Sequence, residues 1–164
     1  GFLSLYGMPL QHIKVHGALY NKLAAEPELF LQLVRQVSGA FGNPVFLTLA
    51  TGRAALLKKK ARCEGLRIAL EAYPDRHYTD EGELAPRKQA GVVLNDPKQI
   101  ARRAVAMVQK KGIESINGRW IDMSIDTLCI HGDNPLSITA AKIMVEAFAK
   151  EGIQIKPLGE IIPR

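Results

Sequence analysis

The spacing of hydrophobic residues changes repeatedly between two and about 3.6 residues along the chain, which predicts alternating strands and helices. The first strand begins at His12 and alternates in polarity until Gly17. Later apolar runs are short and bounded by glycine, proline or charged residues, as is typical of buried strands. Further strands are predicted over residues 44–50, 66–73, 127–132 and 154–158.

Helical spacing occupies the segments between these strands, and each helix has recognisable ends. One begins at Pro27, and another covers 52–64 and ends at Gly65. A third begins at Pro97 with Asn95 or Asp96 as its cap, and the last is capped by Asp133 or Asn134. The expected buried faces are Phe30, Leu33, Val34, Val37 and Phe41; Ile100, Ala104, Met107 and Val108; and Ile138, Ala141, Val145 and Phe148.

Repeated alternation of strand and helix predicts a mostly parallel sheet covered by helices. Asn117-Gly118 lies between β-type residues and predicts a hairpin within 116–120. A long polar loop over 74–91 interrupts the alternation, and loops of this length usually carry function or are disordered. The whole of 1–164 is interpreted as one α/β domain.

Composition narrows the class of protein. Hydrophobic residues make up 47% and charged residues 23%, as in ordinary globular proteins, and no apolar run is long enough for a membrane span. The apolar start lacks the basic region of a signal peptide. The net charge of +6 comes from clusters within predicted helices that have no interleaved aromatic residues, which favours solvated helix faces over nucleic-acid binding. Cys63 and Cys129 form no metal-binding or redox pair, which indicates a reducing, cytoplasmic setting.

Polar residues follow three of the predicted strands, and parallel α/β folds bind ligands at the carboxyl ends of their strands. The candidates are Lys14 and His16 after the first strand, Asp75, Arg76, Tyr78 and Arg87 after the third, and His131 and Asp133 near the end of the chain. A lysine and a histidine on one strand face suit the binding of an anion.

Structural interpretations of the same residues stay open. His16 could be a hydrogen-bonded core histidine, Asp133 a helix cap, and Asp75 with Arg76 a salt bridge inside the loop. His131 with Asp133 also resembles part of a metal site or an acid–base pair. The motifs HExxH, GxxxxGK[ST], GxSxG and GxGxxG are absent from the sequence, so a self-contained ATP site or a serine hydrolase is unsupported.

Three segments of the chain resemble one known family. KVHGALYN at 14–21 is similar to the KPHGALYN signature of the 5-oxoprolinase A-subunit (LamB/YcsF) family. EAYPDRHYTDEGELAPRKQAG at 71–91 and DTLCIHGDNP at 126–135 resemble two further blocks of that family, in the same order. Val15 stands where the family has proline, and Tyr73-Pro74 where it has Phe-Ala. The family's N-terminal motifs would lie before Gly1, so the chain resembles the C-terminal two-thirds of a family protein.

The resemblance implies an irregular (β/α)7-type barrel of the glycoside hydrolase/deacetylase kind, incomplete here because N-terminal strands are missing. It also implies an ATP-dependent enzyme that, with the B and C subunits of 5-oxoprolinase, hydrolyses 5-oxoproline (pyroglutamate) to glutamate. Carried over, the catalytic candidates are His16, His131, Asp133 and Asp75. The substrate-binding candidates are Lys14, Asn21, Arg76, Tyr78 and Arg87.

In this hypothesis a histidine serves as general acid or base while Asp75 or Asp133 orients it or holds a divalent metal ion of unknown identity. The cationic candidates would bind the substrate carboxylate or a transferred phosphoryl group. Two alternatives are a stand-alone metal-dependent hydrolase or deacetylase and a scaffold component without catalytic activity. A nucleic-acid or membrane partner is not expected, and a homo-oligomer is left open.

Overall fold

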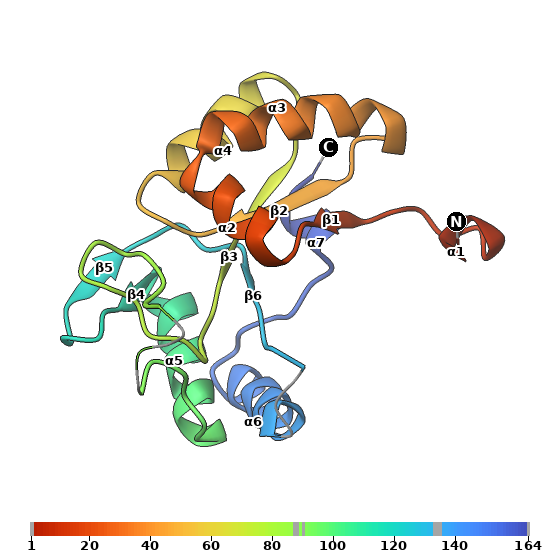
Figure 1. Cartoon of the computed structure of the whole chain (residues 1–164). Coiled ribbons are helices and arrows are strands. Elements are labelled where there is room, and N and C mark those ends of the chain that lie inside the picture. The colour runs from red at the N-terminus through yellow and green to blue at the C-terminus, as the bar shows by residue number, and fades with distance from the viewer. Residues whose placement is uncertain (1, 87–88, 90, 133–135, 164) are drawn as a thin grey trace. The chain divides into compact units, whose positions relative to one another are not determined.

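A computed structural model describes residues 2–86, 89, 91–132 and 136–163 (Figure 1). Its helices are α1 (Phe2–Leu5), α2 (Gly17–Ala25), α3 (Pro27–Ser38), the 3-10 helix η1 (Gly39–Phe41), α4 (Ala54–Cys63), α5 (Pro97–Lys110), α6 (Leu136–Lys150) and α7 (Leu158–Ile161). Its strands are β1 (His12–Lys14), β2 (Val45–Leu49), β3 (Ile68–Ala72), β4 (Gly112–Glu114), β5 (Trp120–Asp122) and β6 (Thr127–Leu128). None of the helices described has the length and hydropathy that crossing a bilayer requires.

The main sheet has the strand order β1-β2-β3-β6 among the described residues. β1 pairs with β2 in parallel, and β3 pairs with β6 in parallel. Between β2 and β3, the N–H of Phe46 donates to the carbonyl of Arg67 and that of Ala50 to Glu71. Both strands thus advance by four residues between the two bonds, as parallel strands do. The α/β fold with a parallel sheet is therefore confirmed, and it is consistent with part of a barrel.

The chain divides into two compact units, each described by itself. The first contains the chain up to Leu49, Arg53–Leu70 and the residues from Lys156 onward. The second contains Ala50–Gly52 and Glu71–Ile155, so β3 contributes residues to both. The single α/β domain inferred from the sequence stays a prediction.

The first unit is built around β2, whose five residues are all buried. Helix α3 adds buried Phe30, Leu31 and Val34. The C-terminal segment returns to this unit, where Leu158 packs with Val45, Leu47 and Ala69. Arg67 fastens that segment, because its guanidinium donates to the carbonyl oxygens of Ile162 and Gly159 as well as to Asn43.

Helices α5 and α6 pack together in the second unit, where Ala101 and Ala104 meet Met144 and Phe148. Asp96 caps α5 as predicted, its Oδ1 accepting from the N–H of Lys98 at 2.9 Å. The predicted face of α6 is confirmed at Phe148, which is buried, but it is wrong at Ile138 and Val145, which are 69% and 51% exposed; Ala140 and Met144 are buried instead. Val108 of α5 and Phe41 after α3, also expected inside, are 37% and 55% exposed.

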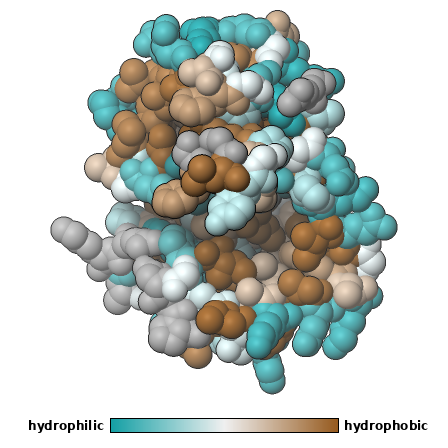
Figure 2. Space-filling view, turned by 90° about the vertical axis from the view of Figure 1, so that its right-hand side faces the viewer, coloured by the Kyte–Doolittle hydropathy of each residue, from teal (hydrophilic) through white to brown (hydrophobic). Residues whose placement is uncertain are grey.

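The predicted hairpin is confirmed, because β4 and β5 are antiparallel and the N–H of Ser115 donates to Arg119 across the turn. The predicted strand at 154–158 is wrong. Residues 153–157 are irregular there, and Pro157 instead precedes α7, since proline lacks the N–H that a central strand needs. Large hydrophobic side chains also remain exposed, among them Phe2, Leu5, Tyr6 and Leu56. Brown patches are visible on the face of the molecule in Figure 2.

Candidate functional site

The end of β3 carries polar side chains into the interior of the second unit. Glu71 and Asp75 are 4% and 7% exposed, although carboxylates are rarely so buried unless they are paired. The hydroxyl of Tyr73 donates to Oε2 of Glu71 at 2.6 Å. The backbone of β3 thus places two carboxylates within five residues of each other, each beside an aromatic or imidazole ring.

Asp75 and His131 form the central pair of this site. Nδ1 of His131 lies 2.7 Å from Oδ2 of Asp75. The His131 side chain is 26% exposed and the Asp75 side chain 10%. The sheet brings them together, because β6 pairs with β3 and the N–H of Cys129 donates to the carbonyl of Ala72. An ionised carboxylate only accepts, so Nδ1 carries the proton and Nε2 is left as the acceptor and potential base.

The ring of Tyr73 completes the surroundings of His131. The two rings are stacked with centroids 5.3 Å apart and planes at 22°. A stacked ring limits the rotation of the imidazole while the Asp75 bond fixes its tautomer. Oδ1 of Asp75 is buried and accepts no hydrogen bond from the residues that the structure describes. The arrangement holds one histidine oriented by a carboxylate, with partial access to solvent.

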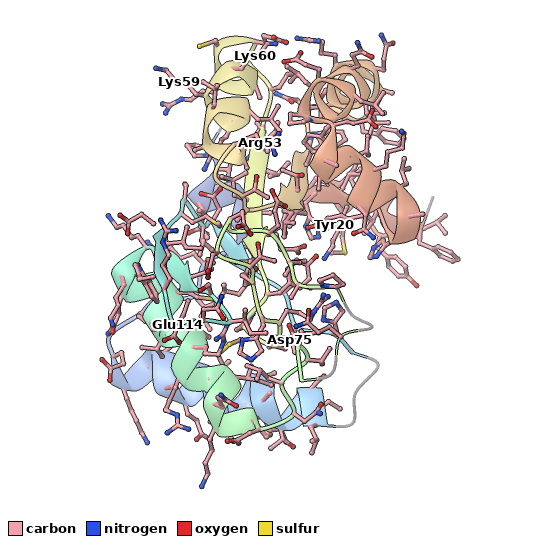
Figure 3. The ribbon with its side chains drawn as sticks, turned by 60° about the vertical axis from the view of Figure 1, so that its left-hand side comes forward. Tyr20, Arg53, Lys59, Lys60, Asp75 and Glu114 are labelled. Carbon is pink, nitrogen blue, oxygen red and sulfur yellow. The ribbon has the colours of Figure 1, made fainter. Side chains whose placement is uncertain are left out.

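Backbone hydrogen bonds hold the loop that follows β3 in place. The N–H of Leu94 donates to the carbonyl of Asp75, and His77 exchanges backbone bonds with Val92 and Ala85. Figure 3 labels Asp75 at this end of the strand. The predicted loop at 74–91 is therefore long but, where described, held by β-bridges such as Arg76 with Val93.

Arg76 and Tyr78 support this loop from inside. Nη2 of Arg76 donates to the carbonyl of Ala85 at 2.6 Å, and the Arg76 side chain is nearly inaccessible. Tyr78 is fully buried, and its hydroxyl accepts the N–H of Tyr73 at 2.8 Å. Burial raises the pKa of Tyr78 well above its usual value, so this phenol stays protonated. Their substrate-binding roles stay predictions.

Three other candidates lie in the first unit. Nζ of Lys14 sits 5.5 Å from the centroid of the Tyr20 ring, and the side chains of His16 and Asn21 are exposed. His16 is the N-terminal cap residue of α2, but its side chain makes no capping bond. Gly17 follows with φ of +64°, a conformation that favours glycine. The positions of these residues relative to His131 are not described, and Arg87 and Asp133 lie outside the described residues.

A metal ligand set is not assembled within the described part of the chain, where no group of three His, Cys, Asp or Glu side chains comes together. The sequence also suggested a His131–Asp133 pair, and Asp133 lies outside the described residues. Sequence reasoning also missed Glu71 and Tyr73. Glu71 could have been found as a charged residue inside an apolar strand, and Tyr73 as the tyrosine that replaces the family's phenylalanine.

Comparison with known proteins assigns the chain to a family. The model of the LamB/YcsF family matches residues 1–163, which is nearly the whole chain. The chain belongs to the LamB/YcsF family. The match covers both the His131–Asp75 pair and the Lys14–His16 segment.

Relatives with a curated name carry the same description. The 5-oxoprolinase A subunit of Pyrococcus horikoshii is 36% identical over 161 residues, covering 98% of this chain and 62% of that protein. The 5-oxoprolinase A subunit of Campylobacter jejuni is 38% identical over 162 residues, again covering 62% of its own length. The chain thus spans about three-fifths of the length of the curated relatives it matches.

A solved structure shows the same fold. The crystal structure of a lactam utilization protein from Thermus thermophilus superposes with a TM-score of 0.80 and 34% sequence identity. It covers 95% of this chain, and the chain covers 61% of that protein. The LamB/YcsF fold therefore extends over the elements described here.

Proposed function

We propose that this LamB/YcsF chain belongs to the A subunit of an ATP-dependent 5-oxoprolinase, which hydrolyses 5-oxoproline (pyroglutamate) to glutamate. The observation that carries the proposal is the His131–Asp75 pair within a chain whose relatives are named as the A subunit of 5-oxoprolinase. The lactam utilization protein of similar fold supports a cyclic amide as the substrate class.

The chemistry explains why ATP would be needed. A lactam is an unreactive amide, because resonance with the ring nitrogen makes its carbonyl carbon a weak electrophile. Transfer of the γ-phosphoryl group of ATP to that oxygen, with release of ADP, makes the ring carbon electrophilic. Water then adds to this carbon and the ring C–N bond breaks, which leaves an acyl phosphate. A second water hydrolyses the acyl phosphate, so that the carboxylate of glutamate forms and inorganic phosphate is released. A proton delivered to the nitrogen completes the amine of glutamate.

His131 is suited to the proton transfers of this sequence. Its Nδ1–H is committed to Asp75, so Nε2 takes a proton from the attacking water and returns it to the leaving nitrogen. Asp75 stabilises the imidazolium that forms between these two steps. The cationic Lys14, Arg76 and Arg87 remain the candidates for binding the substrate carboxylate or the phosphoryl group, with Asn21 and Tyr78 as polar partners.

Other members of the site and the assembly belong to the same proposal. His16 is a second acid–base candidate, and Asp133 a second carboxylate. The B and C subunits of 5-oxoprolinase are the proposed partners, and the proposed location is the cytoplasm. The proposed fold of the complete protein is the irregular (β/α)7 barrel of the glycoside hydrolase/deacetylase kind. Within the described part of the chain no three His, Cys, Asp or Glu side chains come together to hold a divalent metal ion.

The test is 5-oxoproline-dependent ATP hydrolysis by the A subunit reconstituted with the B and C subunits, comparing wild-type residues with His131→Ala. Loss of the general base is expected to lower turnover by about 100-fold or more. His12→Ala is the matched control, since His12 is exposed and its side chain hydrogen-bonds the neighbouring Gln11. Wild-type turnover by His131→Ala would refute the role of His131. Lactam hydrolysis without ATP would favour a stand-alone hydrolase, and complex formation without turnover a scaffold.

A further inference from the structure

A second concave site lies in the second unit, between α5 and the β4–β5 hairpin. It has a volume of about 460 Å³, within the range of about 300–1,000 Å³ typical of small-molecule sites. Polar side chains that line it are His77, Gln99, Arg102, Arg103, Glu114 and Ser115. Figure 3 labels Glu114 on this part of the molecule. Neither His131 nor Asp75 lines this pocket, so the proposed function leaves it without a role.

Arg103 is the fixed element of the pocket. Its Nε donates to the carbonyl of Pro74 at 3.2 Å, and its Nη2 donates to that of Arg76 at 3.0 Å. These bonds orient the planar guanidinium and leave Nη1 to face Glu114, at 4.0 Å. Burial lowers the pKa of Arg103, but an arginine guanidinium keeps its charge at neutral pH. Nη1 therefore presents N–H groups that no described residue accepts at hydrogen-bond distance.

Arg102 adds a second guanidinium from the same helix. It lines the pocket, is exposed, and forms no ion pair with any described residue. His77 contributes a ring that stays neutral at neutral pH, because burial and the charge of Arg103 lower its pKa. Two guanidinium groups thus face one carboxylate, and the lining has an excess of positive charge. Guanidinium forks match the planar oxygens of carboxylate and phosphate groups.

We infer that the pocket between α5 and the β4–β5 hairpin binds a small oxyanion ligand, one carrying a phosphate or carboxylate group, through Arg102 and Arg103. Arg103 positions Nη1, Arg102 closes on the ligand from the solvent side, and Gln99 supplies a polar contact. Glu114 opposes the negative charge and keeps the affinity modest. Because Arg103 also holds the carbonyls that flank Asp75, an occupied pocket stabilises the loop after β3.

The experiment is isothermal titration calorimetry of the chain with inorganic phosphate and, in separate runs, with glutamate, at low ionic strength. Saturable one-to-one binding of at least one probe is expected. Arg102→Ala removes a charge-assisted contact and is expected to weaken binding by about tenfold. Glu114→Gln removes the opposing charge and is expected to tighten it severalfold. Both residues are exposed, and circular dichroism verifies the fold of each variant.

The matched control is Arg62→Ala, the same substitution at an exposed helical arginine of α4 that does not line the pocket. It is expected to leave the affinity unchanged. Equal losses in Arg62→Ala and Arg102→Ala would reveal a general charge effect and overturn the site. Binding lost in His131→Ala but kept in Arg102→Ala would place the anion at the candidate active site and also overturn it, as would no saturable binding. Preference for phosphate or for glutamate identifies which oxyanion the pocket takes.

Discussion

Tyr73 contacts two different groups at once, its hydroxyl bonding Glu71 and its ring stacking on His131. The tyrosine stands where the family resemblance leads us to expect phenylalanine, which has no hydroxyl to make this bond. A phenol that donates to a buried carboxylate makes one of the stronger classes of hydrogen bond. Tyr73 therefore connects the buried Glu71 of β3 with His131, the candidate base.

Tyr73→Phe is expected to lower the free energy of unfolding by about 1–3 kcal/mol, because a buried hydrogen bond to a charged acceptor is lost. The ring stack on His131 remains, so the substitution tests the hydroxyl alone. Urea denaturation followed by circular dichroism measures the change. Tyr6→Phe is the matched control, since Tyr6 is 77% exposed and should show almost no effect. Equal stability of the two variants would contradict the importance of the Glu71 bond.

His77 gives the second unit a dependence on pH. Burial, reinforced by Arg103 and partly opposed by Glu114, lowers its pKa from the ordinary 6.5. The unfolded chain therefore takes up a proton at higher pH than the folded chain, and stability falls as the pH drops below about 6.5. In His77→Gln this part of the acid-side loss should disappear. Urea midpoints at pH 8, 6.5 and 5 measure it, and identical slopes for both proteins would contradict the assignment.

At the scale of elements, the hairpin depends on close contact at Gly112. A Cβ atom there would lie 2.7 Å from Nε1 of Trp120 and would also collide with the carbonyl oxygen of Ile121. Backbone and a packed indole cannot both move aside cheaply. The strand β4 therefore pairs with β5 only with glycine at this position.

Gly112→Ala is expected to destabilise the protein by about 2 kcal/mol or more, because the overlap forces the hairpin strands apart. Hydrogen–deuterium exchange should show the loss of protection at Ser115 and Met123, whose N–H groups bond within and beside the hairpin. Gly52→Ala is the control, since nothing lies within 4 Å of the added Cβ and its φ is not positive. If both variants keep native protection, the packing argument fails.

The sequence predicted helix starts and turns correctly where one or two residues determine the local backbone. Asp96 with Pro97 marked the start of α5, and Asn117-Gly118 marked the turn of the hairpin. The predicted buried face of α6 was wrong at Ile138 and Val145, because the helix is apolar almost all round. Two overlapping apolar stripes could therefore have faced the core. The stripe through Ala140 and Met144 is buried instead, and tertiary packing against α5 makes that choice.

The candidate site shows the same limit. Asp75 and His131 were recognisable because each follows a predicted strand, and the family resemblance singled out both. Their pairing depends on which strands are neighbours, and the adjacency of β3 and β6 brings together residues 56 positions apart without any local signal. The sequence left Asp75 and Asp133 as alternative partners of a histidine, and the sheet brings Asp75 to His131.

At the scale of the whole molecule, the chain spans 62% of its curated relatives. In the described sheet β1 pairs only with β2, and β6 only with β3. Edge strands present backbone groups that another strand can satisfy. The remaining length of the family proteins is thus expected to matter for turnover.

We predict that this chain supports 5-oxoproline-dependent ATP hydrolysis poorly with the B and C subunits, and that a longer chain containing the unmatched part of the relatives restores it. Because hydrolysis needs all groups of the site, the difference should exceed about 100-fold. Coupled measurement of ADP release compares the two chains at equal concentration. The His131→Ala form of the longer chain is the control for background hydrolysis. Equal activity of the two chains would show that the unmatched length is dispensable.

Backbone carbonyls of irregular segments accept hydrogen bonds from the guanidinium groups of three arginines, Arg67, Arg76 and Arg103. A lysine keeps the charge but cannot fork between two carbonyls. In a library of Arg→Lys variants selected only for folding, lysine variants at these three positions should become rare. Lysine variants at Arg62 and Arg102 should remain as frequent as before selection. Tolerance to lysine would then show which arginine side chains the fold requires for their forked hydrogen bonds.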